Sequence, residues 1–253
     1  MRTYGAIIIG DEIMRGKRQD KHFAKLVEIL GERGLHLSWV QYLGDERPRL
    51  VDHLRRTLAS GDVVFSYGGI GVTPDDHTRQ AAALAAAVPL ELNADAEREI
   101  RARMAEMGQP VTPARLELGT VPQGSRIIPN PFNRIPGFSY RDHHFLPGFP
   151  QMAWPMAEWV LDTYYADDFR QDVEIEAAIL VWEGLEGTLI DLMRQTEADF
   201  PGITVFSLPS FGSDTVQRHV ELGVRGAPEA VATSIEVLKA GVVALGYRYD
   251  IKP

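Results

Sequence analysis

The residues best suited to binding or catalysis lie in one segment, residues 65–78, which reads FSYGGIGVTPDDHT. Three glycines follow an apolar run, and two adjacent carboxylates come a few residues later: Gly68, Gly69, Gly71, Asp75 and Asp76. Glycine adopts backbone conformations closed to other residues, so successive N–H groups in such a turn can converge on one anion. The segment therefore predicts a phosphate-binding turn between a strand and a helix that opens with the two carboxylates.

The two carboxylates have more than one interpretation. Beside a phosphate site they repel the ligand unless they cap the helix, take protons or hold a metal ion. Of these, the metal ion would serve a phosphorylated ligand directly, and Thr73 and Thr78 could add hydroxyl donors. The alternative is a plain strand-to-helix turn with an acidic cap, and the glycine spacing alone favours this alternative because short glycine motifs are common.

Composition excludes several chemistries. The chain has 253 residues, a net charge of -9 and no cysteine, so disulfides, thiolate nucleophiles and cysteine-ligated metals are absent. Its acidity argues against nucleic acid as a partner, because such binding depends on clustered Lys and Arg. We find no apolar run of about 18 residues and no secretory signal, so we expect a cytoplasmic protein with no membrane partner.

Hydrophobic runs and breakers predict alternating strands and helices in the first two thirds of the chain. Strands are expected at residues 4–9, 35–43 and 63–67, with helices at 20–33, 47–58 and 75–87. Such alternation indicates an α/β fold, a three-layer parallel or mixed sheet with helices on both faces. Further helices are expected at 94–107 and 151–165, and hairpins between them at 125–128, 138–140 and 143–146.

Ligands of such sheets bind outside the carboxyl ends of the strands, so the loops that follow the strands matter most. These loops begin with Gly10-Asp11-Glu12, with Gly44-Asp45 and with the glycine turn at 68–76. We expect them to gather their carboxylates around one cleft. A basic cluster, Arg15, Lys17, Arg18 and Lys21, lies beside the first loop and indicates either an approaching anion or a solvated loop.

The remainder of the chain predicts a second domain. Strands at 172–180, 203–208 and 215–224 with helices at 185–197 and 228–245 give the order β-α-β-β-α. This order indicates a small antiparallel sheet with two helices on one face. We therefore divide the chain into domains at residues 1–167 and 168–253.

Taken in order, these motifs resemble the molybdopterin-binding domain of molybdenum-cofactor biosynthesis proteins, over residues 4–165. The likeness is closest to the N-terminal part of competence/damage-inducible protein A, whose C-terminal amidase domain has no counterpart in this sequence. It is carried by Gly10-Asp11-Glu12-Ile13, Gly16, Asp20, Gly44-Asp45, residues 68–78, Pro122, Gly124, Asn130, Pro136-Gly137-Phe138 and residues 146–150. Leu185-Glu186-Gly187 and residues 206–210 resemble the small domain that follows it.

The resemblance implies a site for a phosphorylated pterin, such as molybdopterin, or for a nucleotide. By motif position, the catalytic aspartates fall on Asp45 and Asp76, and a divalent cation (Mg²⁺, Mn²⁺ or Co²⁺) on Asp75 and Asp76. The implied ligand-binding residues are Gly10, Asp11, Glu12, Asp20, Gly68, Gly69, Gly71, Thr73, Thr78, Pro147 and Gly148. The leading hypothesis is a metal-dependent pyrophosphatase of the ADP-ribose type; the alternative is a non-catalytic molybdopterin- or nucleotide-binding protein. The family also implies a homo-oligomer, either a dimer or a trimer.

Four positions depart from the family pattern. Val72 stands where proline is usual, Lys21-His22 where Thr-Asn is usual, and Asn133 where glycine is common. The change at Lys21-His22 alters a wall of the expected pocket. Among the aromatic residues, Phe149, Trp154 and Trp159 could stack on a ligand ring, although core packing is the default for aromatics at helical spacing.

Overall fold

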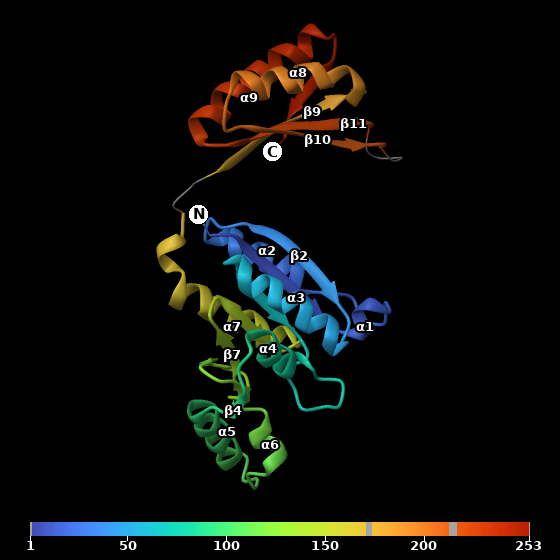
Figure 1. The fold of residues 1–253 in the computed structure, drawn as a ribbon. Helices are drawn as coiled ribbons and strands as arrows, with labels where there is room; N and C mark the ends of the chain where they lie inside the picture. Colours follow the sequence, from blue (N-terminus) through green and yellow to red (C-terminus); the bar gives the residue numbers. More distant parts are fainter. Residues whose placement is uncertain (1, 171–173, 213–216, 253) are drawn as a thin grey trace. The chain divides into compact units, whose positions relative to one another are not determined.

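The computed structural model describes residues 2–170, 174–212 and 217–252. The chain divides into two compact units, residues 1–169 and residues 170–253 (Figure 1). We refer to them as unit 1 and unit 2. Within the described ranges, none of the helices is long and apolar enough to cross a membrane.

Unit 1 is built on a six-stranded mixed sheet in the order β2-β1-β3-β8-β7-β6. Its strands are β1 (Tyr4–Ile9), β2 (Leu37–Leu43), β3 (Val63–Tyr67), β6 (Arg126–Ile128), β7 (Gly137–Tyr140) and β8 (His143–Leu146). The four neighbours β2, β1, β3 and β8 run parallel, whereas β7 is antiparallel to β8 and to β6. β1 and β3 are buried along their whole length because helices cover both faces of the sheet. The predicted α/β, three-layer mixed-sheet fold is confirmed.

Each face of this sheet has its own apolar core. On one face, Ile8 and Phe65 pack with residues of α2 (His22–Glu32) and α7 (Pro150–Tyr164). On the other, Ile7 and Val64 pack with residues of α3 (Arg47–Ser60) and α4 (Thr78–Ala86). Successive residues of a strand point to opposite faces, so the apolar runs of β1 and β3 supply both cores at once.

A small substructure interrupts the main sheet between α4 and β6. It contains the two-stranded antiparallel sheet β4 (Leu90–Leu92) and β5 (Thr120–Pro122), with α5 (Ala94–Glu106) and α6 (Pro113–Glu117) between them. The side chain of Asn93 caps α5 by accepting from the N–H groups of Asp95 and Ala96. The sequence predicted α5, but not the short elements β4, β5 and α6.

Two helix starts in unit 1 differ from the prediction. α4 begins at Thr78, because the carboxylate of Asp76 accepts from the N–H and hydroxyl of Thr73 and folds the preceding residues into a turn. Asp75 and Asp76 thus lie before the helix, and the expectation that they open it is wrong. The helix expected from residue 20 is α2, and a one-turn helix, α1 (Asp11–Met14), precedes it. A 3-10 turn at Ala166–Asp168 follows α7.

Unit 2 is an antiparallel sheet in the order β10-β11-β9-β12, with two helices over one face (Figure 1). Its elements are β9 (Ile175–Trp182), α8 (Glu186–Asp199), β10 (Thr204–Ser210), β11 (His219–Gly226), α9 (Pro228–Ala244) and β12 (Arg248–Ile251). The predicted sheet and helix layer are confirmed, and β12 was not predicted. The expected strand starts at residues 172 and 215 lie outside the described residues.

Candidate functional site

A cavity of about 620 Å³ opens at the carboxyl ends of β1, β2, β3 and β8. Four parallel strands end at this edge of the sheet, so the loops that follow them meet there. Most of the residues expected to bind ligand or metal line the cavity: Gly10, Glu12, Asp45, Gly68, Gly69, Gly71, Thr73, Asp75, Asp76, Pro147 and Gly148.

The glycine turn after β3 has a backbone that only glycine fits. Gly68 has φ +101° and Gly69 has φ +67°, both in the region that disfavours side chains. A Cβ on Gly68 would overlap the carbonyl oxygen of Ile9, and a Cβ on Gly69 would overlap the hydroxyl of Thr78. A Cβ on Gly148 would lie 3.6 Å from the Cα of Gly68, at ordinary contact distance, so the two turns are neighbours.

Four consecutive N–H groups of this turn donate no hydrogen bond within the described part of the chain: those of Gly69, Ile70, Gly71 and Val72. Their neighbours on both sides are paired. The N–H of Gly68 donates to the Leu146 carbonyl at 2.9 Å, and the N–H of Thr73 donates to Asp76 at 2.8 Å. All four residues with unpaired N–H groups line the cavity. The turn therefore keeps a run of donors available to a ligand.

Four carboxylates line the same cavity: Glu12, Asp45, Asp75 and Asp76. Asp45 is half-buried and accepts from the N–H of Asp11 at 2.8 Å. Burial raises the pKa of Asp45, helped by the neighbouring charges of Asp11, Glu12 and Asp75 and opposed by the Asp11 hydrogen bond. A concentration of negative charge this dense favours either a cation or a proton near Asp45.

Three of the expected ligand-binding residues do not line the cavity, and their side chains bond other parts of the protein. Asp11 receives the N–H of Asp45 at 3.3 Å and pairs with Arg15. Asp20 caps α2 through the N–H groups of His22 and Phe23. Thr78 is fully buried, and its hydroxyl donates to the Gly68 carbonyl at 3.0 Å instead of pointing to a ligand.

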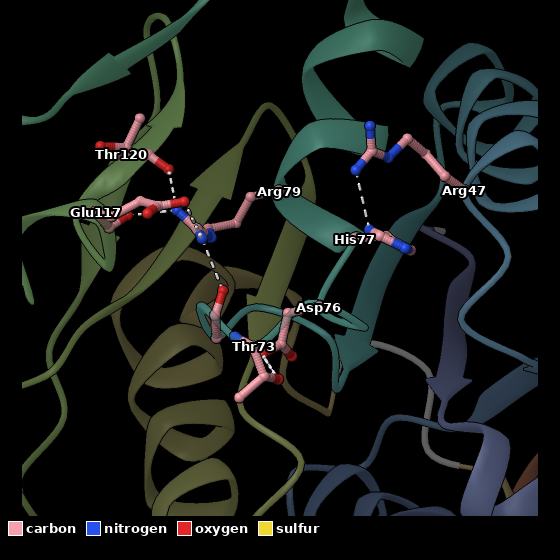
Figure 2. Close-up of polar contacts among 8 residues, drawn as sticks. Arg47, Thr73, Asp76, His77, Arg79, Glu117 and Thr120 are labelled. Carbon is pink, nitrogen blue, oxygen red and sulfur yellow. Dashed lines mark hydrogen bonds and ion pairs between the residues drawn. The ribbon is translucent and has the colours of Figure 1, made fainter. Parts of the chain in front are cut away.

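The expected metal site is not formed by protein groups alone. Among residues 2–170, 174–212 and 217–252, there is no group of three or more His, Cys, Asp or Glu side chains that could hold a metal ion. One oxygen of Asp76 is already engaged by Thr73, as Figure 2 shows. Asp75 and Asp76 can supply some of a cation's oxygen ligands, but not its complete coordination shell.

Another part of the cavity wall was predicted only at Phe149, as a candidate to stack on a ligand ring. It is formed by Leu118, Asn130, Asn133, Ile135, Pro136, Phe149 and Met152. Asn130 and Asn133 shape the wall: Asn130 donates to Asn133 and to the Ile135 carbonyl, both at 2.9 Å. No periodicity identifies these residues, because they come from the end of α6, from irregular loops and from the start of α7. Phe149 is 53% exposed at the cavity, whereas Trp154 and Trp159 pack against the core.

The loop after β1 contributes the cationic side chain of Arg18, and the start of α2 contributes His22, which departs from the family pattern. Of the basic cluster, Arg18 lines the cavity, which supports the interpretation that the cluster faces an anion. His22 stacks on Tyr67 with ring centroids 4.4 Å apart, and its Nε2 lies 3.3 Å from the Gly148 carbonyl. Burial lowers the pKa of His22. Its Nε2 is the donor in the contact with Gly148, because a carbonyl oxygen can only accept. Lys21 and His22 line a smaller depression of about 300 Å³ that shares Glu12, Arg18 and Gly148 with the cavity.

Comparison with known proteins identifies the family. Residues 5–166 match the family model described as "Probable molybdopterin binding domain". The chain belongs to this family. The matched residues are almost the whole of unit 1 and include every residue that lines the cavity.

Its similar proteins include members named as CinA-like. A CinA-like protein of Anaeromyxobacter sp. (strain Fw109-5) is 33% identical over 157 residues, which is 60% of this chain and 38% of that protein. Another, from Sulfurihydrogenibium sp. (strain YO3AOP1), is 33% identical over 208 residues, 79% of this chain and 52% of that protein. The chain thus spans between about a third and a half of these relatives. The solved structure of the protein CinA from Thermoplasma acidophilum, 25% identical, covers 64% of this chain and 98% of its own, with a TM-score of 0.57.

Proposed function

We propose that unit 1 binds a phosphorylated pterin or nucleotide, with a phosphate on the glycine turn. The observation that carries this proposal is the run of four unpaired N–H groups from Gly69 to Val72, all at the cavity wall. Backbone N–H groups that point at one place form an anion site without any cationic side chain. Arg18 adds a positive charge at the same cavity.

The opposite wall suits a flat ring. Ile135, Pro136, Phe149 and Met152 present apolar surface to the cavity, and Phe149 is 53% exposed there. Small-molecule sites typically combine such apolar walls with a few well-placed polar groups. A ligand with a phosphate at one end and an aromatic ring at the other would therefore use both walls.

Binding is tested by calorimetric titration of the whole chain with ADP-ribose and with adenosine, which has the ring but no phosphate. We expect ADP-ribose to bind at least about 10-fold more tightly, a difference of about 1.4 kcal/mol, because only it reaches the glycine turn. A phosphorylated pterin would behave like ADP-ribose. Equal affinities for the two probes, or no binding of either ADP-ribose or a pterin phosphate, would contradict the proposal.

We further propose that this site hydrolyses the pyrophosphate of an ADP-ribose-type nucleotide with a divalent cation. The supporting observation is that Glu12, Asp45, Asp75 and Asp76 line the cavity that holds the phosphate donors. Asp75 and Asp76 would offer carboxylate oxygens to Mg²⁺, Mn²⁺ or Co²⁺. The described residues contain no group of three or more side chains that could hold a metal ion by themselves. This is compatible with Mg²⁺, which is usually held by one or two carboxylates together with substrate phosphates.

In this mechanism the residues of the chain have separate roles. The N–H groups of the glycine turn hold one phosphate and keep it still. Asp45, oriented by the N–H of Asp11, would accept a proton from the attacking water, and its raised pKa suits that role. When bound, the cation would neutralise phosphate charge.

Turnover is tested with Asp45→Asn and Asp76→Asn, measured as AMP released from ADP-ribose with each of the three metals. Asn keeps an oxygen that can accept from Asp11 or Thr73, so the loops hold their shape. We expect turnover to fall about 100-fold or more while ADP-ribose still binds. Asp52→Asn, on the exposed side of α3, is the matched control. Wild-type protein that binds but never hydrolyses would instead be a non-catalytic binding protein.

A further inference from the structure

A buried arginine lies directly behind the glycine turn. Arg79 is the second residue of α4 and is only 1% exposed. Its guanidinium donates to three carbonyl oxygens, those of Gly71 at 2.7 Å, of Thr120 at 3.0 Å and of Glu117 (Figure 2). Residues Gly69 to Val72, which carry the unpaired N–H groups, line the cavity. Arg79 does not line the cavity and contacts the turn from the protein interior.

We propose that Arg79 is the positioning residue of the anion site, holding the carbonyl of Gly71 away from the cavity so that the adjacent N–H groups face a phosphate. This inference rests on the proposed function. A peptide unit carries its N–H and C=O on opposite sides, so fixing the carbonyl of Gly71 also fixes the N–H of Val72. A carbonyl oxygen that turned toward the phosphate would repel it and remove a donor at the same time.

The shape of guanidinium suits this role better than a simple positive charge would. Arginine presents its donors in a rigid planar fork, and here the fork joins the turn at Gly71 to the segment at residues 117–120. Leu118, within that segment, lines the cavity. One side chain thus connects the phosphate donors to the opposite part of the cavity wall.

The charge of Arg79 is also poorly cancelled. Its carboxylate partner, Glu117, is 3.7 Å away and 54% exposed, and its other acceptors are carbonyl oxygens without net charge. Arginine stays protonated in proteins, so a positive charge persists behind the turn. This charge favours an anion on the cavity side and offsets part of the repulsion from Asp76 on the same loop.

The experiment compares Arg79→Met and Arg79→Lys with Glu117→Gln in the full chain, using ADP-ribose and inorganic phosphate as probes. Arg79→Met should weaken binding about 10-fold or more. Arg79→Lys keeps the charge, but its donors all lie on one nitrogen and cannot span the three carbonyls, so it should recover only part of that loss. Glu117→Gln keeps its backbone carbonyl and should bind as well as wild type or slightly better. If the ion pair with Glu117 were the purpose of Arg79, Glu117→Gln and Arg79→Met would weaken binding alike, which would overturn the proposal.

A second readout needs no ligand. The amide NMR signals of Gly71 and Val72 report the hydrogen bond at the carbonyl between them, and we expect both to move in Arg79→Met. Arg98→Met, which removes an exposed arginine of α5 that pairs with Asp95, is the matched control and should leave them unchanged. If wild type binds neither probe, the proposed function fails and the NMR comparison still decides the role of Arg79. Unmoved signals in Arg79→Met would overturn that role even if the protein binds phosphate.

Discussion

Unit 1 has two regions rich in polar groups, and they use their hydrogen bonds differently. At the glycine turn, four consecutive N–H groups have no acceptor within the described residues. At the histidine pair of β8, three of the four ring nitrogens have a partner: Nε2 of His143 bonds the hydroxyl of Thr57 at 2.9 Å, and the two nitrogens of His144 bond Ser139 and Tyr165 at 2.8 and 2.7 Å. Both regions lie on the same sheet, so the difference is not one of fold.

The histidine pair shows what polar residues look like when they serve the structure. Their side chains point to opposite faces of the sheet, as those of successive strand residues do, and so they cannot chelate one metal. Burial lowers the pKa of His143 to about 4 and of His144 to about 3, so both rings are neutral at pH 7. Perturbed pKa values alone would have marked this pair as functional. The unpaired donors, and not the shifted pKa values, distinguish the candidate site.

The largest effect we expect comes from closing the glycine turn with Gly68→Ala. The new Cβ would overlap the carbonyl oxygen of Ile9 at a residue with φ +101°, so β3 and β1 must separate or the turn must change shape. We expect ADP-ribose affinity to fall about 100-fold and stability by roughly 3 kcal/mol. Calorimetry and chemical unfolding measure the two losses.

Gly61→Ala separates backbone strain from loss of the site. Gly61 ends α3 with φ +81°, and a Cβ there would meet nothing within 4 Å. It should cost about 1 kcal/mol of stability and leave ligand affinity unchanged. If Gly61→Ala and Gly68→Ala weakened ADP-ribose binding equally, the proposal that the backbone of residues 68–72 binds the phosphate would be wrong.

The histidine pair should affect how the stability of the fold depends on pH, and should not affect ligand binding. Because the folded pKa values lie below the ordinary value of about 6.5, the unfolded chain binds more protons once the pH falls below about 6.5. Stability is therefore full above that pH and is lost as the pH falls toward the folded values. Between pH 7 and 5, we expect a loss of about 2 kcal/mol for each histidine.

Chemical unfolding of His143→Gln at pH 7 and pH 5 checks this expectation. Glutamine cannot titrate, and its amide can still bond the hydroxyl of Thr57, so the variant should lose less stability than wild type over that interval. His36→Gln, at an exposed histidine, should follow the wild-type curve. Identical pH dependence in all three proteins would mean that the pair is not buried and neutral.

The sequence predicted the sheet and most of the cavity because both follow from short-range patterns. Apolar runs located the parallel strands, and the strand ends located Gly10, Asp45 and the glycine turn at one edge. The start of α4 was predicted too early, because Asp76 looks like a helix cap in sequence but folds back onto Thr73 in the structure. Whether a carboxylate caps a helix or a turn depends on backbone angles that composition does not reveal.

The rest of the site depends on contacts between residues far apart in the chain. The bonds of Arg79 span 38 and 41 residues to reach Glu117 and Thr120, through elements too short to show periodicity. The wall built by Asn130 and Asn133 is an irregular loop held by its own side chains. Such long-range and irregular contacts leave no repeating signal, so only the folded structure identifies these residues.

The smallest effect we expect concerns Thr78. The sequence predicted that its hydroxyl binds the ligand, whereas in the structure the hydroxyl bonds the glycine turn. If Thr78 bound the ligand, Thr78→Val would reduce affinity more than stability. In the structure its hydroxyl is buried and donates to the Gly68 carbonyl, so the variant leaves that carbonyl without a donor. We expect a stability loss of about 1–2 kcal/mol and an affinity loss of only about 3-fold, through a slightly looser turn. Thr78→Ser, which keeps the donor, should restore most of both. Chemical unfolding and ADP-ribose titration of the two variants measure these quantities. If Thr78→Val lost affinity strongly with unchanged stability, Thr78 would be a ligand-binding residue after all. A hydroxyl that only holds the turn must, when removed, lower the stability of the fold before it lowers affinity.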